Sequence, residues 1–114
     1  MTVIVAGNID FEPDDVAVML ETARPHIEGA YTEKGCVHYI WTPDPHRPGR
    51  VQVFEEWETS EDLSAHLSSH WYADMRAHMG KFRRTGASVR KYRVDLSEPV
   101  YDATGKARGD FFTA

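Results

Sequence analysis

The sequence predicts a small α+β domain in which two helices cover one face of a four-stranded antiparallel sheet. Four stretches are rich in β-branched and aromatic residues, as strands are. A stretch with the apolar period of a helix lies between the first and the second of them, and another lies between the third and the fourth. Between the second and the third there is only a loop of turn-forming residues. The order β-α-β-β-α-β that results is the ferredoxin-like split βαβ arrangement.

The first strand is expected over residues 2–10, where β-rich residues suit a strand with both faces at least partly covered. Pro13, followed by Asp14 and Asp15, then marks a helix start, because proline fits the first turn and carboxylates favour the positive end of the helix dipole. Pro25 is expected to kink this helix or end it early. One apolar stripe along it would lie on the sheet: Val16, Leu20, Ala23 and Ile27.

The two middle strands are expected over residues 36–42 and 51–57, joined by a long loop over 43–50 that is dense in proline, glycine and aspartate. Thr59 then supplies a capping hydroxyl for a second helix that runs to Gly80. Its apolar residues recur every fourth position: Leu63, Leu67, Trp71, Met75 and Met79. The last strand is expected over residues 88–96.

The chain divides into one domain, residues 1–98, and a C-terminal tail, residues 99–114. The tail ends in Phe111 and Phe112, so we expect it to dock on the domain or on a partner subunit. With both helices on one face, the other sheet face stays bare and apolar. Packing against the same face of a second copy would bury these apolar side chains. We therefore expect a homodimer, in which the two sheets form a dimeric α+β barrel.

Composition narrows the function classes. The chain carries 18 acidic against 13 basic residues, so nucleic acid is not an expected partner. No run approaches the roughly 20 apolar residues that span a bilayer, and the N-terminus lacks the build of a secretory signal, so we expect a soluble, cytoplasmic protein with no membrane partner. Cys36 is the only cysteine, which excludes an intrachain disulfide, and we expect it to be structural.

Several short motifs together resemble the antibiotic biosynthesis monooxygenase domains, in particular their quinol monooxygenase-like members. They are Pro25-His26, Gly35-Cys36-Val37-His38-Tyr39, Val53-Phe54-Glu55-Glu56-Trp57 and Leu63-x-x-His66-Leu67-x-x-x-His70. Their order and spacing match over roughly residues 3–96. The resemblance implies this fold and a family that includes cofactor-independent oxygenases of quinols and anthrones, haem-degrading relatives and members of unknown activity.

The haem-degrading relatives carry a tryptophan and, about three turns later, a histidine that ligates iron. The resemblance puts His66 and Arg76 at these positions. Because a guanidinium stays protonated, Arg76 cannot give a lone pair to iron. We therefore expect no haem, and more generally no bound cofactor or metal.

Two histidines of the second helix are the candidate catalytic residues. His66 and His70, followed by Asp74, recur every four residues and would share one flank of the helix. A neutral imidazole there could take a proton from a phenolic substrate, and the electron-rich anion could pass an electron to dioxygen without a metal or flavin. The expected partners are thus a small aromatic substrate and dioxygen. The candidate substrate-binding residues are Trp57, Trp71, Tyr72, Tyr39 and Trp41 as walls, and Arg24 or Arg90 for an oxyanion.

Plainer interpretations stand beside these. Such histidines are often structural, and the aromatic residues could belong to the core or to a dimer interface. The spacing of His66 and His70 could also chelate a transition metal, with Asp74 as a third ligand. The glutamates of the sequence EEWE, residues 55–58, are expected to lie on the strand surface without a chemical role. At the level of the whole protein, the alternatives are a non-catalytic module that binds or senses a small molecule, and a purely structural subunit.

Overall fold

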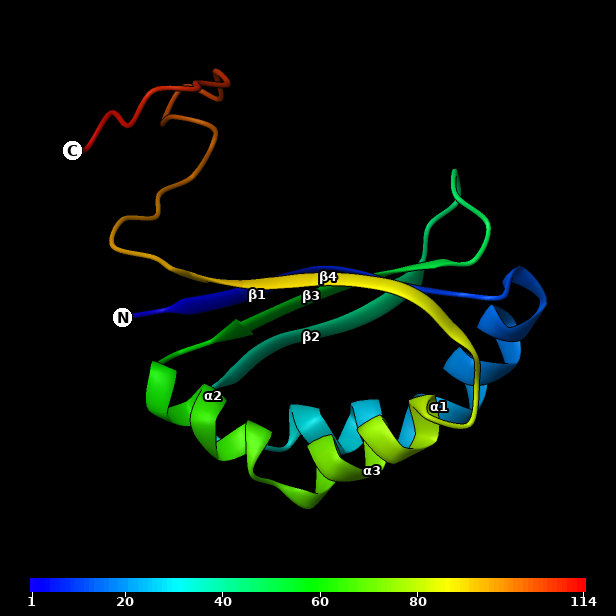
Figure 1. The fold of residues 1–114 in the computed structure, drawn as a ribbon. Helices are drawn as coiled ribbons and strands as arrows, with labels where there is room; N and C mark the ends of the chain where they lie inside the picture. Colours follow the sequence, from blue (N-terminus) through cyan, green and yellow to red (C-terminus); the bar gives the residue numbers. More distant parts are fainter.

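The computed structural model describes all residues, 1–114, and has the expected ferredoxin-like α+β fold. Its four strands form one antiparallel sheet in the order β2-β3-β1-β4, and the helices cover one face of it (Figure 1). None of the helices has the length and apolar character to cross a bilayer. In chain order the elements are β1 (Val3–Phe11), the 3-10 turn η1 (Pro13–Asp15), α1 (Val16–Tyr31), β2 (Cys36–Pro43), β3 (Arg50–Trp57), α2 (Ser60–Leu67), α3 (His70–Met79) and β4 (Arg84–Arg93).

The core lies between the helices and one sheet face. Alternate residues of the two central strands point into it, so Val51 and Val53 of β3 pack with Ile9 and Phe11 of β1. From the helices, Met19 is fully buried in the same cluster. A second cluster around Trp57, Tyr39 and Leu63 fills the other end of the layer. Tight packing at these sites fixes how the helices sit over the sheet.

Helix α1 continues past Pro25 to Tyr31, so the expectation that this proline ends the helix early is wrong. Proline cannot donate a hydrogen bond to the carbonyl of Glu21, one turn back. Both residues lie on the exposed side of α1, where water can satisfy that carbonyl. Packing of the buried side of α1 on the sheet keeps the helix intact.

The second helix is two helices, which corrects the expectation of a single helix to Gly80. α2 ends at Leu67, and α3 begins at His70 with a new cap, in which the hydroxyl of Ser69 accepts a hydrogen bond from the Tyr72 amide at 3.3 Å. The chain turns between them, so side chains before and after the break do not share one flank. The last strand also begins and ends earlier than expected, at Arg84 and Arg93.

The sheet face away from the helices carries no element of the chain (Figure 1). Exposed apolar side chains lie on neighbouring strands of this outer face: Ile40 is 41% exposed, Phe54 38% and Tyr92 48%. Tyr39 and Trp41 alternate with Ile40 along β2 and therefore face the helices instead. The outer face is thus a continuous, partly apolar surface.

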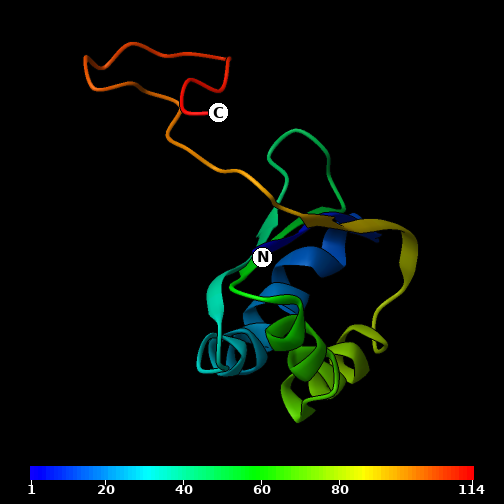
Figure 2. The ribbon, with the colours of Figure 1, turned by 90° about the vertical axis from the view of Figure 1, so that its left-hand side faces the viewer.

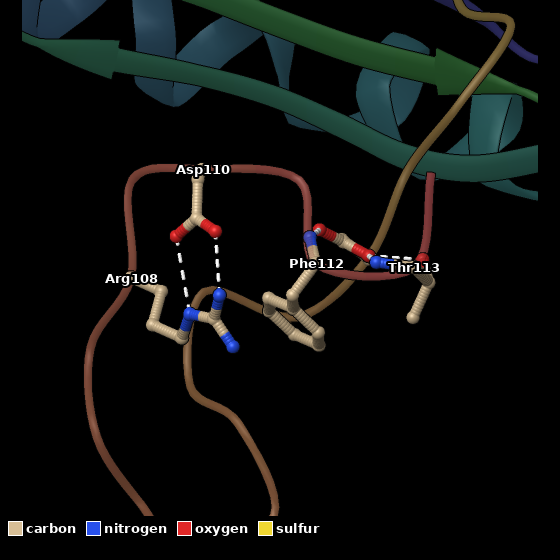
Figure 3. Close-up of polar contacts among 5 residues, drawn as sticks. Arg108, Asp110, Phe112 and Thr113 are labelled. Carbon is tan, nitrogen blue, oxygen red and sulfur yellow. Dashed lines mark hydrogen bonds and ion pairs between the residues drawn. The ribbon is translucent and has the colours of Figure 1, made fainter.

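Beyond β4 the chain forms a folded C-terminal arm, residues 98–113. Figures 1 and 2 show it standing clear of the domain, on the helix-free side of the sheet. Internal polar contacts close it (Figure 3): the Glu98 carboxylate accepts hydrogen bonds from the backbone amides of Phe112 at 2.7 Å and Thr113 at 3.1 Å, and from the Thr113 hydroxyl. Arg108 pairs with Asp110 and lies over the Phe112 ring.

Candidate functional site

A cavity of about 510 Å³ lies between the helix-facing side of the sheet and helices α2 and α3. Its walls are mostly apolar, and three aromatic side chains take part, Tyr39 and Trp41 from β2 and Tyr72 from α3. Strand β4 supplies the side away from these rings, including the half-exposed Val89. The volume and lining suit a small, flat, apolar molecule.

Gly7 keeps the middle of the sheet beside this cavity free of side chains. It pairs with Val53 on one side and Val89 on the other, and both of these line the cavity. A Cβ atom at Gly7 would lie 2.0 Å from the Ser88 carbonyl oxygen, so β4 approaches too closely for any other residue. The glycine therefore both permits this strand pairing and leaves room in the sheet surface.

Glu55 is the one carboxylate in the cavity wall. It lies on β3 between Val53 and Trp57, on the helix-facing side, and is buried. Burial raises the pKa of Glu55, and the hydrogen bond that its Oε1 accepts from the Trp57 indole at 3.0 Å opposes this rise. A carboxylate in a largely apolar cavity is a stronger base than one in water, which suits proton abstraction.

His66 lies directly behind this wall. Its side chain is 1% exposed, its ring stacks on Trp57 with centroids 4.7 Å apart, and Tyr39 and Tyr72 meet it edge-on. Its Nδ1 donates a hydrogen bond of 2.6 Å to Glu33, because the carboxylate can only accept. His66 is therefore held in a buried aromatic cluster next to the cavity and does not line it.

The other residues predicted for the site lie elsewhere. His70 is 67% exposed, with Asp74 at 3.3 Å, because the break after α2 turns it away from His66. Trp71 packs on α1, where a Cβ atom at Gly29 would come within 2.2 Å of its ring. Arg24 is exposed on α1 and pairs with Glu21. Of the predicted set, the structure brings Tyr39, Trp41, Tyr72 and Arg90 into the cavity wall and places His66 and Trp57 behind it.

The same geometry separates the two histidines that could have chelated a metal. His66 is buried and bonded to Glu33, whereas His70 begins another helix and faces solvent. No three histidine, cysteine or acidic side chains are grouped as ligands. Cys36 lies at the start of β2, and burial raises the pKa of its thiol to about 11, so it stays protonated at neutral pH.

Sequence reasoning missed Glu55. The signal was available, because alternation along Val53-Phe54-Glu55-Glu56-Trp57 puts Glu55 on the same face as Val53 and Trp57. A carboxylate between two core residues is a buried charge that needs an explanation, and the cavity supplies one. Tyr39 beside it is also buried, and this burial, with the nearby Glu55 carboxylate, raises the pKa of its phenol, which stays a neutral hydrogen-bond donor.

The family model of the antibiotic biosynthesis monooxygenases matches residues 2–84. This range contains the helices, the first three strands and both core clusters between the helices and the sheet. The chain belongs to this family. It is also 23% identical over 92 residues to the uncharacterized protein sll1783 of Synechocystis sp., a match that covers 81% of the chain and 63% of that relative. The chain thus spans less than two thirds of this longer protein.

Solved structures agree on the fold. A putative antibiotic biosynthesis monooxygenase from Deinococcus radiodurans superposes with a TM-score of 0.76 at 18% identity, covering 85% of this chain and 96% of that one. Rv0793 from Mycobacterium tuberculosis superposes with a TM-score of 0.72 at 22% identity, covering 86% and 98%. Sequence identities at this level support the same fold but not the same reaction. The reaction has to be inferred from the residues of the site.

Proposed function

We propose that this chain is a monooxygenase that oxidises a small aromatic quinol or polyketide-like phenol with dioxygen, without a bound cofactor. The observation that carries the proposal is the position of Glu55, a buried carboxylate in the wall of an apolar, aromatic-lined cavity. The family's monooxygenase-like role and the aromatic residues Tyr39, Trp41 and Tyr72 in the cavity lining agree with such a substrate. Glu55 replaces His66 and His70 as the proposed base.

In the first step, the Glu55 carboxylate takes the phenolic proton of the bound substrate. The phenolate then transfers one electron to dioxygen, and the resulting pair of radicals combines to form a C–O bond at a ring carbon, ortho or para to the oxygen, that carries hydrogen. Glu55 returns its proton to the peroxide anion that forms. Loss of water from this peroxide leaves a second carbonyl, so one oxygen atom enters the quinone and the other leaves as water. The chain itself orients the ring, holds the proton and keeps water out.

His66 and Trp57 serve as positioning residues in this scheme. The Trp57 indole holds one oxygen of Glu55, and His66 stacks on that indole while Glu33 fixes its own orientation. Tyr39, kept neutral by burial, is available to donate a hydrogen bond to an oxyanion. The two tyrosines and Trp41 are the proposed walls for the ring.

The test is oxygen uptake by metal-stripped protein with anthrone and 1-naphthol, compared with the spontaneous rate. Glu55→Gln is expected to lower the enzymatic rate by about 10²-fold or more, as loss of a general base does. Glu58→Gln, the same change at an exposed glutamate that does not line the cavity, is the matched control and should keep the parent rate. With ¹⁸O₂, one labelled atom should appear in each quinone formed.

Two outcomes would contradict the proposal. Uptake that persists in Glu55→Gln would remove Glu55 as the base. Binding of these compounds without any uptake above the spontaneous rate would favour the alternative function, a module that binds or senses a small aromatic molecule.

The same proposal includes a homodimer in which the outer sheet faces pack together. The outer face exposes Ile40, Phe54 and Tyr92 on neighbouring strands, and packing against a second copy would bury these side chains. The C-terminal arm and the β2–β3 loop, residues 44–49, both rise on this side of the sheet, at opposite ends of it (Figures 1 and 2). They leave the face between them open for the sheet of a second copy.

The arm is the proposed contact beyond the sheet. It makes its polar contacts within itself, yet its apolar side chains remain exposed: Val100, Tyr101 and Phe111. Because the arm is already folded on itself, binding through its exposed apolar residues would cost little additional conformational entropy. Docking on the partner subunit would bury these residues, whereas in the single chain they meet no part of the domain.

A further inference from the structure

The cavity wall carries more positive than negative side chains, although the protein as a whole is acidic. The protein carries a net charge of −5, yet the lining contains four cations, Arg76, Arg84, Arg90 and Lys91, against the single carboxylate of Glu55. Arg76 lies on α3 and the other three on β4. Three of the cations therefore lie on β4, at the opposite edge of the sheet from Tyr39 and Trp41 of β2, and Arg76 lies on α3 beside Tyr72.

These four cations have no acidic partner within the chain. Other arginines do: Arg50 binds Asp10 at 2.9 Å and Arg83 lies 3.6 Å from Glu12. Arg76 instead donates a long hydrogen bond of 3.3 Å to the hydroxyl of Tyr72, and both residues line the cavity. Unpaired cations beside an apolar cavity attract an anionic ligand and raise its local concentration.

Strand register fixes the position of the nearest strand cation relative to Glu55. Val5 of β1 pairs with Glu55 on one side and with Lys91 on the other, and all three line the cavity. Adjacent strands lie about 4.8 Å apart, so the backbones of Glu55 and Lys91 are about 10 Å apart across the sheet. Two fused aromatic rings span most of that distance.

We infer that the cavity takes an anionic aromatic substrate, a flat phenol whose carboxylate or similar group sits at Lys91 and Arg76 while its hydroxyl meets Glu55. This inference rests on the proposed function and adds the charge and the orientation of the substrate. The anionic group anchors the far end of the ring, so the phenol points toward the base. A neutral phenol of the same shape lacks this anchor and binds more weakly.

Two stable probes test the inference by binding alone. 6-Hydroxy-2-naphthoate carries its hydroxyl and carboxylate at opposite ends of two fused rings, and 6-hydroxy-2-naphthamide is its neutral counterpart. Titration calorimetry should give about tenfold tighter binding of the naphthoate at about 20 mM salt, with the preference falling to about twofold at about 500 mM. The variant with Lys91→Gln and Arg76→Gln together should lose about tenfold for the naphthoate and less than about twofold for the amide.

Arg83→Gln is the control for the loss of a nearby cation, because it removes one positive charge next to Arg84 from a side chain that lies outside the lining. It should change neither affinity. Equal binding of acid and amide, a preference that survives the double variant, or no binding of either probe would overturn the inference. Because no turnover is measured, absence of oxygen uptake would count against the proposed reaction and leave this result standing.

Discussion

The ring of His66 lies stacked on the indole of Trp57, with centroids 4.7 Å apart and planes inclined by 29°. That indole donates to Glu55 in the cavity wall, and the imidazole donates to Glu33 on the other side. The four side chains thus form one connected unit from the α1–β2 connection to the cavity. In the proposed reaction, this makes His66 a support for Glu55, the proposed base.

This arrangement predicts different outcomes for the two histidines. His66→Ala removes a buried ring and leaves the Glu33 carboxylate without its donor, so it should lower the free energy of unfolding by about 2–4 kcal/mol. His70→Ala, at an exposed position, should change it by less than about 0.5 kcal/mol. Urea unfolding followed by tryptophan fluorescence measures both. Equal effects would contradict the buried packing of His66.

The raised pKa of Glu55 predicts a pH dependence of stability with a definite sign. Because burial raises this pKa in the folded chain, the folded state holds the proton more tightly than the unfolded state. The contribution of Glu55 to stability is then full below its unfolded pKa and is lost as pH rises through its folded pKa. Glu55→Gln lacks this loss, so the variant should gain stability relative to the parent between about pH 4 and pH 8.

Paired urea titrations of the parent and Glu55→Gln at the two ends of that range give the result. A difference in stability that stays constant with pH would show that Glu55 has an ordinary pKa. The same ionisation should govern catalysis in the opposite sense, because the base must be deprotonated. Oxygen uptake is therefore expected to rise with pH through the folded pKa of Glu55 and then level off.

The sequence predicted the layers of the fold because each strand and helix has its own apolar period. It did not predict the break after Leu67, since the spacing of Leu63, Leu67, Trp71 and Met75 runs through the break unchanged. Only the capping hydroxyl of Ser69 marks it. That one turn decides which histidine is buried, which is why the predicted pair of His66 and His70 does not converge.

The outer sheet face predicts the oligomeric state. Phe54→Asp places a charge in the centre of the proposed interface, next to Ile40 on β2, and burying it there without a partner is costly. The variant should be monomeric in analytical ultracentrifugation at concentrations where the parent is dimeric. Val18→Asp changes an equally apolar, exposed position on α1 and should leave the dimer intact. A parent that sediments as a monomer would remove the homodimer.

The closure of the C-terminal arm depends on Glu98. Hydrogen bonds from Thr113 and from the Phe112 amide hold the pKa of this carboxyl below its ordinary value, so the closure is present above the unfolded pKa and is lost as pH falls through the folded pKa. Glu98→Gln should therefore speed hydrogen exchange at the Phe112 and Thr113 amides at neutral pH. Asp95→Asn, an exposed carboxylate on the preceding segment, is the control and should leave these rates unchanged.

If the arm docks on the partner subunit, the same Glu98→Gln change should also weaken the dimer, because an open arm must be ordered again before it can bind. Dissociation measured by dilution in the ultracentrifuge should then occur at a higher protein concentration than for the parent. Faster exchange with an unchanged dimer would support the role of Glu98 in closing the arm and would contradict docking of the arm on the partner subunit. Unchanged exchange would mean that the Arg108–Asp110 pair and the Phe112 ring beneath Arg108 suffice to keep the arm closed.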